Sequence, residues 1–164
     1  MWRQSLLLIL FILPLASSMA GDASVKEANL PSTPAERLYV LSQQANWQIR
    51  RAVAGNRRAP LTLLLQLASD PDLRVRIAVA TNLSSPEEVH MLLARDEEKA
   101  VRSVVARFEY VSADALALLA KDHDPEIRFE VAGNWNTSVS TLNRLQGDSF
   151  ELVRQRAEQE LARR

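Results

Sequence analysis

Five arginines recur in this sequence at intervals of 26 residues, each directly after an isoleucine or a valine. They are Arg50, Arg76, Arg102, Arg128 and Arg154. A guanidinium group binds carboxylates and phosphates through paired hydrogen bonds, so five of them in one register could form a ladder for an anionic ligand. Aspartates recur at the same interval, at Asp70, Asp96, Asp122 and Asp148. The arginines could therefore bind an external anion or form internal ion pairs.

The joint recurrence of the two sets favours internal pairing. Their charges nearly cancel, and Asp70 precedes Arg76 by six residues, an offset that repeats along the chain. We expect each Arg to pair with an Asp of its own or the adjacent unit, while the Asp caps a helix start. The sequence thus predicts a structural ladder that comprises Arg50, Arg76, Arg102, Arg128, Asp70, Asp96 and Asp122.

Other groups that could perform catalysis or bind a metal are sparse. The chain has two histidines, His90 and His123, without the spacing of metal ligands, and four glycines that form no phosphate-binding loop. It has no cysteine, which excludes disulfides, iron–sulfur ligation and thiol catalysis. We therefore expect no enzymatic activity and no cofactor.

Hydrophobic and polar columns share the 26-residue register, which identifies an internal repeat. A valine column contains Val53, Val79, Val105 and Val131, and a leucine column contains Leu41, Leu67, Leu93, Leu119 and Leu145. A second leucine column contains Leu38, Leu64, Leu116 and Leu142, interrupted by His90. An asparagine column contains Asn56, Asn82 and Asn134, interrupted by Phe108. The leucines are expected to form the core, and the asparagines to satisfy turn backbone from unit to unit.

Each unit contains two short helical patterns. In the first, Val75 and Val79 fall on one face at helical spacing. In the second, Ser85 suits the N-cap and Pro86 the first helical position, before an apolar face that includes Leu93. No alternating strand pattern is present, and one helix pair cannot bury its apolar face alone. The sequence predicts an all-α solenoid of about four and a half helix–turn–helix units.

The ends of the repeat region differ from its middle. A half unit begins near Ser32, and residues 21–31 are polar with little periodicity, which indicates a linker. At the other end, Glu158 and Glu160 replace the alanine and asparagine of the inner units. The last helix therefore becomes polar, as expected for a capping helix that closes a solenoid toward solvent. The solenoid is predicted to cover residues 32–164.

The pattern Asp-x-x-x-x-Val-Arg-x-x-Val-Ala-x-Asn, followed by Pro and Leu-x-x-Leu, resembles the leucine-rich repeat variant family. Residues 70–95 match it along their whole length, and the resemblance extends over residues 32–158. It implies a right-handed superhelix of alternating α- and 3₁₀-helices. The unit here is slightly longer than usual for the family, which would let both helices be α. A family member carries an iron–sulfur cluster on a Cys-rich segment that this chain lacks, and HEAT-like repeats are the nearest alternative.

The N-terminus indicates export. Arg3, an apolar run broken by Pro14, and small residues before position 21 are typical of a signal peptide at 1–20, although an uncleaved anchor is an alternative. Cleavage leaves 144 residues with 19 basic and 20 acidic side chains, which argues against nucleic-acid binding. We expect a periplasmic or secreted monomer of a Gram-negative bacterium, with no membrane span after cleavage.

Positions that vary between units could bind a partner, because the scaffold does not dictate them. Arg51, Ile77 and Phe129 are expected to face away from the core on the first helices. Phe108, Tyr110 and Trp135 lie in or beside turns, where they could meet a partner or wedge between units. The expected function is a non-enzymatic scaffold that binds a protein or peptide of the bacterial cell envelope.

Two alternative functions remain open at this stage. One is a structural envelope component without a dedicated ligand. The other is a binder of an anionic ligand through a basic cluster in the first unit, formed by Arg50, Arg51, Arg57 and Arg58. Salt-sensitive binding would distinguish the anion binder from the other two.

Overall fold

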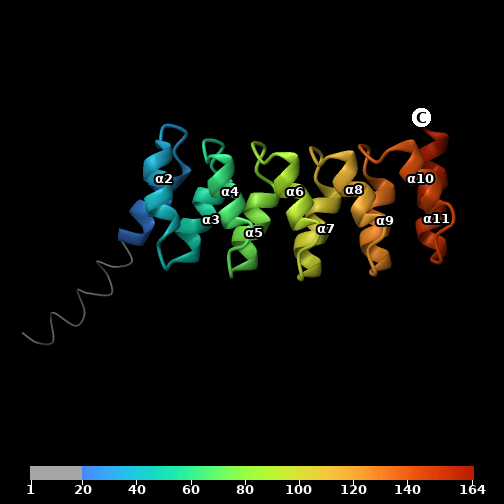
Figure 1. The fold of residues 1–164 in the computed structure, drawn as a ribbon, viewed down its shortest axis with the longest axis horizontal. Helices are drawn as coiled ribbons and strands as arrows, with labels where there is room; N and C mark the ends of the chain where they lie inside the picture. The colour runs from blue at the N-terminus through green and yellow to red at the C-terminus, as the bar shows by residue number, and fades with distance from the viewer. Residues whose placement is uncertain (1–19) are drawn as a thin grey trace, which may run out of the picture.

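The chain folds as a row of stacked helix pairs in the computed structural model, which describes residues 20–164. The helices that follow the one at 20–29 are α2 (Ala35–Ser42), α3 (Trp47–Gly55), α4 (Leu61–Leu67), α5 (Leu73–Ala80), α6 (Glu87–Leu93), α7 (Lys99–Arg107), α8 (Ala113–Leu119), α9 (Pro125–Gly133), α10 (Val139–Leu145) and α11 (Glu151–Ala162). Figure 1 shows the pairs side by side, from α2 at the blue end to α11 at the red end. No strand occurs in this part of the chain, so the predicted helical solenoid is confirmed.

Both helices of each unit are α-helices. The first helix of a unit (α3, α5, α7 or α9) has eight or nine residues, and the second (α4, α6, α8 or α10) has seven. The second helices follow Pro60, Pro86, Ser112 or Ser138. Pro86, expected as the first helical residue, is the N-cap, and the Ser85 hydroxyl instead donates to the Val79 carbonyl at 2.7 Å.

The N-terminal segment differs from its prediction. Residues 20–29, most of the expected linker, are helical, and Ala28 is fully buried. Asn56 Nδ2 donates to the carbonyls of Ala28 and Leu30, at 2.6 and 3.0 Å. This helix is therefore the first helix of a complete unit, and α2 is its second. The pattern concealed it because Ser24 and Glu27 stand in the arginine and valine columns.

The expected signal peptide at 1–20 lies, except for Ala20, outside the described residues. Between residues 20 and 164, no helix has the length and apolar character needed to cross a membrane.

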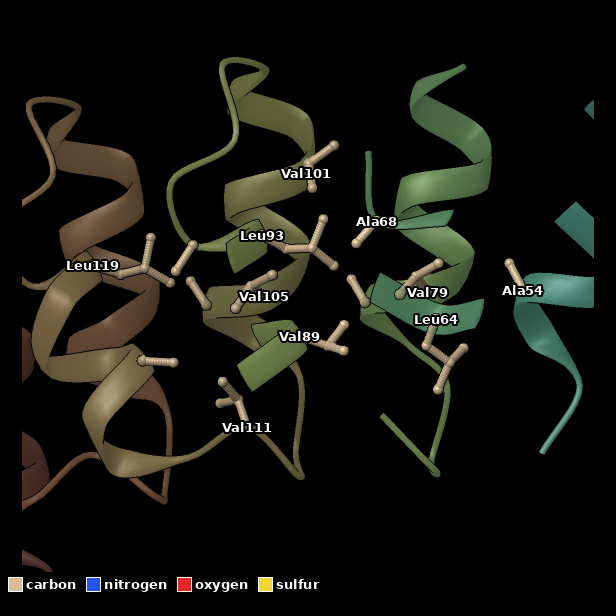
Figure 2. Packing of buried hydrophobic residues seen from close by; sticks show 14 of the residues in the cluster. Ala54, Leu64, Ala68, Val79, Val89, Leu93, Val101, Val105, Val111 and Leu119 are labelled. Atoms are coloured by element: carbon tan, nitrogen blue, oxygen red, sulfur yellow. The ribbon is translucent and has the colours of Figure 1, made fainter. Parts of the chain in front are cut away.

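The leucine and valine columns form one continuous core, as predicted. Leu41, Leu67, Leu93, Leu119 and Leu145 are all buried. In Figure 2, Leu93 of α6 lies near Val101 and Val105 of α7, and Leu64 of α4 lies near Val79 of α5, so the core continues from one unit into the next. Successive first helices pack on one another, α3 on α5 and α7 on α9, so each unit covers the apolar side of the next.

Leu93→Ala is expected to destabilise the protein by about 2–5 kcal/mol, because it removes buried methyl groups and leaves a cavity. Leu92→Ala on the same helix is a matched control, since Leu92 is 41% exposed and Leu93 only 1%. Urea unfolding followed by circular dichroism measures both variants. We expect Leu67→Ala, another buried member of the column, to behave like Leu93→Ala. Equal unfolding midpoints for Leu93→Ala and Leu92→Ala would contradict the assignment.

Candidate functional site

The arginine ladder joins neighbouring units. Arg76 Nε and Nη2 donate to both carboxylate oxygens of Asp96, at 2.7 and 3.0 Å, and Arg76 Nη1 donates to the carbonyl of Asp70 at 2.8 Å. The same cross-unit pairs are Arg50–Asp70, Arg76–Asp96, Arg102–Asp122 and Arg128–Asp148. Their side chains are largely withdrawn from solvent. These four arginines are therefore engaged inside the solenoid.

The aspartates of the ladder do not themselves cap helices, contrary to the prediction. Asp70 Oδ1 accepts a hydrogen bond from the backbone N–H of Asp72, and Asp72 is the N-cap of α5. Each ladder aspartate thus orders the loop two residues before the helix. At the last pair, the hydrogen bond from Arg128 lowers the pKa of the Asp148 carboxyl and raises that of the guanidinium.

The asparagine column also links units, as expected. Asn82 Nδ2 donates to the carbonyls of Ala54 and Asn56 in the preceding unit, at 2.6 and 3.0 Å. Its Oδ1 accepts from the backbone N–H of Ser84 at 2.8 Å. One buried side chain therefore satisfies three backbone groups, which explains the recurrence of asparagine.

The two exceptions in the columns compensate for each other. Phe108 stands where an asparagine would donate to the Ala80 carbonyl, and His90 Nε2 lies 3.3 Å from that oxygen. The His90 and Phe108 rings pack with centroids 5.5 Å apart. The histidine in the leucine column thus supplies the missing donor. Burial lowers the pKa of His90 despite the opposing effect of the hydrogen bond.

His90 is expected to make stability fall on mild acidification. Because its pKa is lowered in the folded state, the unfolded chain takes up the proton first. The free energy of unfolding should therefore decrease as pH falls from 6.5, the ordinary value, toward the lowered one. Urea unfolding between neutral and mildly acidic pH measures this. His90→Leu/Phe108→Asn, which restores the column residues, should abolish that slope, and an unchanged slope would contradict the assignment.

The structure divides the six predicted partner residues among three places. Tyr110, Phe129 and Trp135 line one depression of about 830 Å³ between α7, α9 and α11, which we call the aromatic pocket. Arg51 and Ile77 line a second, of about 560 Å³, beside the helix at 20–29. Phe108 lines neither and packs against the core.

Ile77 differs from its expected exposure, and Phe108 follows one of the two interpretations that the sequence left open. Ile77, expected to face solvent, is half-buried against the core because first helices pack closely on one another. Phe108 wedges between units, as the alternative interpretation had it, and its ring packs edge-on against Tyr110 at 5.7 Å. Tyr110 itself remains exposed.

The aromatic pocket combines exposed rings with an arginine. Trp135 is 76% exposed and Tyr110 is 67% exposed. Arg156 lies 5.8 Å from the centre of the Phe129 ring, and its buried Nε has no hydrogen-bond partner among the described residues. A Cβ at Gly133 would approach Arg156 to 2.9 Å, so the glycine admits the guanidinium. The pocket therefore offers ring faces beside an arginine donor.

Sequence reasoning missed part of this pocket. Arg107, Glu130 and Arg156 also line it, and they come from three successive units. The one signal that could have indicated Arg156 is Gly133, whose missing side chain makes room for it.

The basic cluster of the first unit is divided by the fold. Arg50 forms an ion pair with Asp70, in which Nε lies 2.7 Å from Oδ2. Arg51 and Arg57 line the second depression, and Arg58 does not. Within residues 20–164, no group of three or more acidic or histidine side chains is placed to hold a metal ion.

Comparisons with known proteins point to one repeat family. The family model described as "Leucine rich repeat variant" matches residues 47–72. A solved structure described as a leucine-rich repeat variant with a novel repetitive protein structural motif superposes with a TM-score of 0.62 at 28% identity. The match covers 79% of this chain and 52% of that one, so the chain spans about half the length of that structure. The comparison with curated proteins found no match.

Proposed function

The chain belongs to the leucine-rich repeat variant family, and on that premise we propose that it is a scaffold that binds a protein or peptide of the bacterial cell envelope. The aromatic pocket is the proposed binding site. The observation that carries the proposal is that Trp135 and Tyr110 are exposed and line one depression together with Phe129. Large exposed rings are costly in water and are enriched at the centres of protein interfaces.

Polar groups of the pocket suit a polypeptide partner. The unpartnered Nε of Arg156 could donate to a carbonyl or carboxylate of the partner. Arg107, Glu109 and Glu130 place charges of both signs around the rings, which can set orientation and specificity. Neither sign dominates, which favours a polypeptide over a uniformly charged polymer.

The envelope location rests on the N-terminal sequence. The apolar run before position 21 is typical of an exported chain, and cleavage after Ala20 would leave residues 21–29 of the first helix at the start of the mature protein. Mass spectrometry of the protein from fractionated cells tests this. A periplasmic or secreted chain beginning at Gly21 supports it, and an intact chain in the cytoplasm would contradict it.

Trp135→Ala/Tyr110→Ala is expected to weaken partner binding by about 30-fold or more, as loss of aromatic anchors does at interfaces. Tagged full-length protein captures the partner from envelope extract after gentle crosslinking, and titration with the purified partner then gives the Kd. Leu61→Ala, an exposed apolar residue on α4 outside the pocket, is the matched control. Unchanged binding by the pocket variant would contradict the site. Absence of any partner would favour a structural envelope component.

A second candidate is an anion binder, favoured by the presence of Arg51 and Arg57 in the second depression. Binding there should weaken steeply with salt and should be lost in Arg51→Ala/Arg57→Ala while Trp135→Ala leaves it unchanged. The opposite pattern supports the aromatic pocket.

A further inference from the structure

The aromatic pocket and the second depression lie on the same face of the solenoid. Four columns of the 26-residue register line both, and in the second depression these columns hold Arg51, Ala52, Gly55 and Arg57. Their members in the aromatic pocket are Phe129, Glu130, Arg156, Arg107, Gly133, Glu109 and Trp135. Equivalent positions of stacked repeats point in the same direction, so the two depressions belong to one surface.

This surface is continuous from one depression to the other. Figure 1 shows α3, α5, α7, α9 and α11 in one row, and successive members of the row pack on one another. The second depression includes residues of α3 and α5, and the aromatic pocket includes residues of α7, α9 and α11. One column is exposed in all four units along the way, at Arg57, Leu83, Glu109 and Trp135. We call the surface from Arg57 to Trp135 the first-helix face.

The two ends of the first-helix face differ in charge. In the second depression, Arg51 and Arg57 are exposed, and Asp22 is the one acidic side chain among the described residues that line it. In the aromatic pocket, two arginines and two glutamates balance each other around exposed rings. One end therefore suits a carboxylate, and the other suits an aromatic or large apolar side chain.

The separation of the two ends sets the length of a segment that contacts both. Trp135 follows Arg57 by 78 residues, which is three repeats. Packed helices lie about 8–10 Å apart, so three steps along the row span about 24–30 Å. An extended chain advances about 3.3 Å per residue, so about seven to nine residues bridge the ends. A helix would need about 16–20 residues at 1.5 Å each, and ordering the longer segment costs more conformational entropy.

We propose that the first-helix face binds one extended polypeptide segment across both depressions. A carboxylate of the segment lies between Arg51 and Arg57, and an aromatic or large apolar side chain enters the aromatic pocket. The aromatic end is the binding site proposed above, on which this assignment rests. The arginine end adds an acidic determinant at a fixed spacing, so the two candidate sites are the two ends of one.

The probe is a phage-displayed library of random peptides of about 20 residues, long enough for either the extended or the helical spacing. It is selected on the immobilised full-length protein. Enriched peptides should carry an aspartate or glutamate and a large apolar or aromatic residue about eight positions apart. Selection on Arg51→Glu/Arg57→Glu should lose the acidic preference, and selection on Trp135→Ala/Tyr110→Ala should lose the apolar one.

Titration of one enriched peptide, labelled with a fluorophore, then measures the contribution of each end by anisotropy. Either double variant should weaken binding by at least about tenfold, as loss of an anchor does at interfaces. Deletion of about four residues between the two determinants leaves the peptide too short to span, and should cost as much as losing one end. Leu61→Ala, on a second helix outside this face, should bind like the wild type.

The outcomes separate this proposal from the function on which it rests. Binding that depends on Trp135 and Tyr110 alone would overturn the spanning site and leave the aromatic pocket as proposed. Binding that depends on Arg51 and Arg57 alone would overturn both and favour the anion binder. A spacing of about 16–20 residues would overturn the extended conformation and indicate a helix. No enrichment over the unselected library would overturn peptide binding at either end.

Discussion

Removal of α11 is expected to unfold the protein or make it aggregate. Val153 and Ala157 are buried where α11 packs on α9 and α10, so a chain that ends at Gly147 exposes this part of the core. The same truncation removes Asp148 and leaves Arg128, at the last paired rung, without its carboxylate. An internal unit of a solenoid cannot serve as its end, because its outer face is apolar.

Circular dichroism and size-exclusion chromatography of the two chain lengths measure this effect. A chain that ends at Ala162 retains α11 and is the matched control, expected to remain folded and soluble. The truncated chain should lose helical signal or elute as an aggregate. A soluble fragment of residues 21–147 with a cooperative unfolding transition would show that α11 does not cap the solenoid.

Arg102→Ala is expected to destabilise the protein by about 3–5 kcal/mol, the usual cost of removing one partner from a buried ion pair. The Asp122 side chain is only 5% exposed, so the substitution leaves its carboxylate buried without a guanidinium partner. It also removes the donor to the carbonyls of Asp96 and Glu97. One side chain therefore stabilises both the loop of its own unit and the junction with the next.

Urea unfolding of the single and double variants tests this account. Asp122→Ala should also destabilise, and Arg102→Ala/Asp122→Ala should lose less than the sum of the two, because the double variant leaves no unpaired charge. Arg163→Ala, an exposed arginine outside the ladder, should remain close to the wild type. If Arg102→Ala were as stable as Arg163→Ala, or if the two ladder effects simply added, the pair would not stabilise the junction.

The sequence indicated where a ladder arginine contacts its own unit, but it left the carboxylate partner of that arginine open. The offset of six residues between Asp70 and Arg76 indicated an interaction, and it is the Asp70 carbonyl that receives Arg76. The carboxylate partner of Arg76 is Asp96, 20 residues onward in the next unit. The register alone allowed either aspartate. Stacking decided between them, because it sets which loop lies beside the guanidinium edge.

The helical wheel was accurate about the core and less so about the flanks. It placed Val75 and Val79 inside, and both are fully buried. It placed Ile77 outside, whereas neighbouring first helices partly cover that side chain. A wheel describes one isolated helix, so it cannot show which flank a neighbouring helix will cover.

The sequence by itself determined the repeat, the helices and the leucine core, because recurring apolar positions at helical spacing can be buried only by stacking equivalent units. Only the tertiary structure decided which residues make the contacts between neighbouring units. It placed His90 where the asparagine column fails, made the helix at 20–29 part of the solenoid, and assembled the aromatic pocket from three successive units. These features depend on contacts between residues of different units, whose partners the packing of neighbouring helices selects.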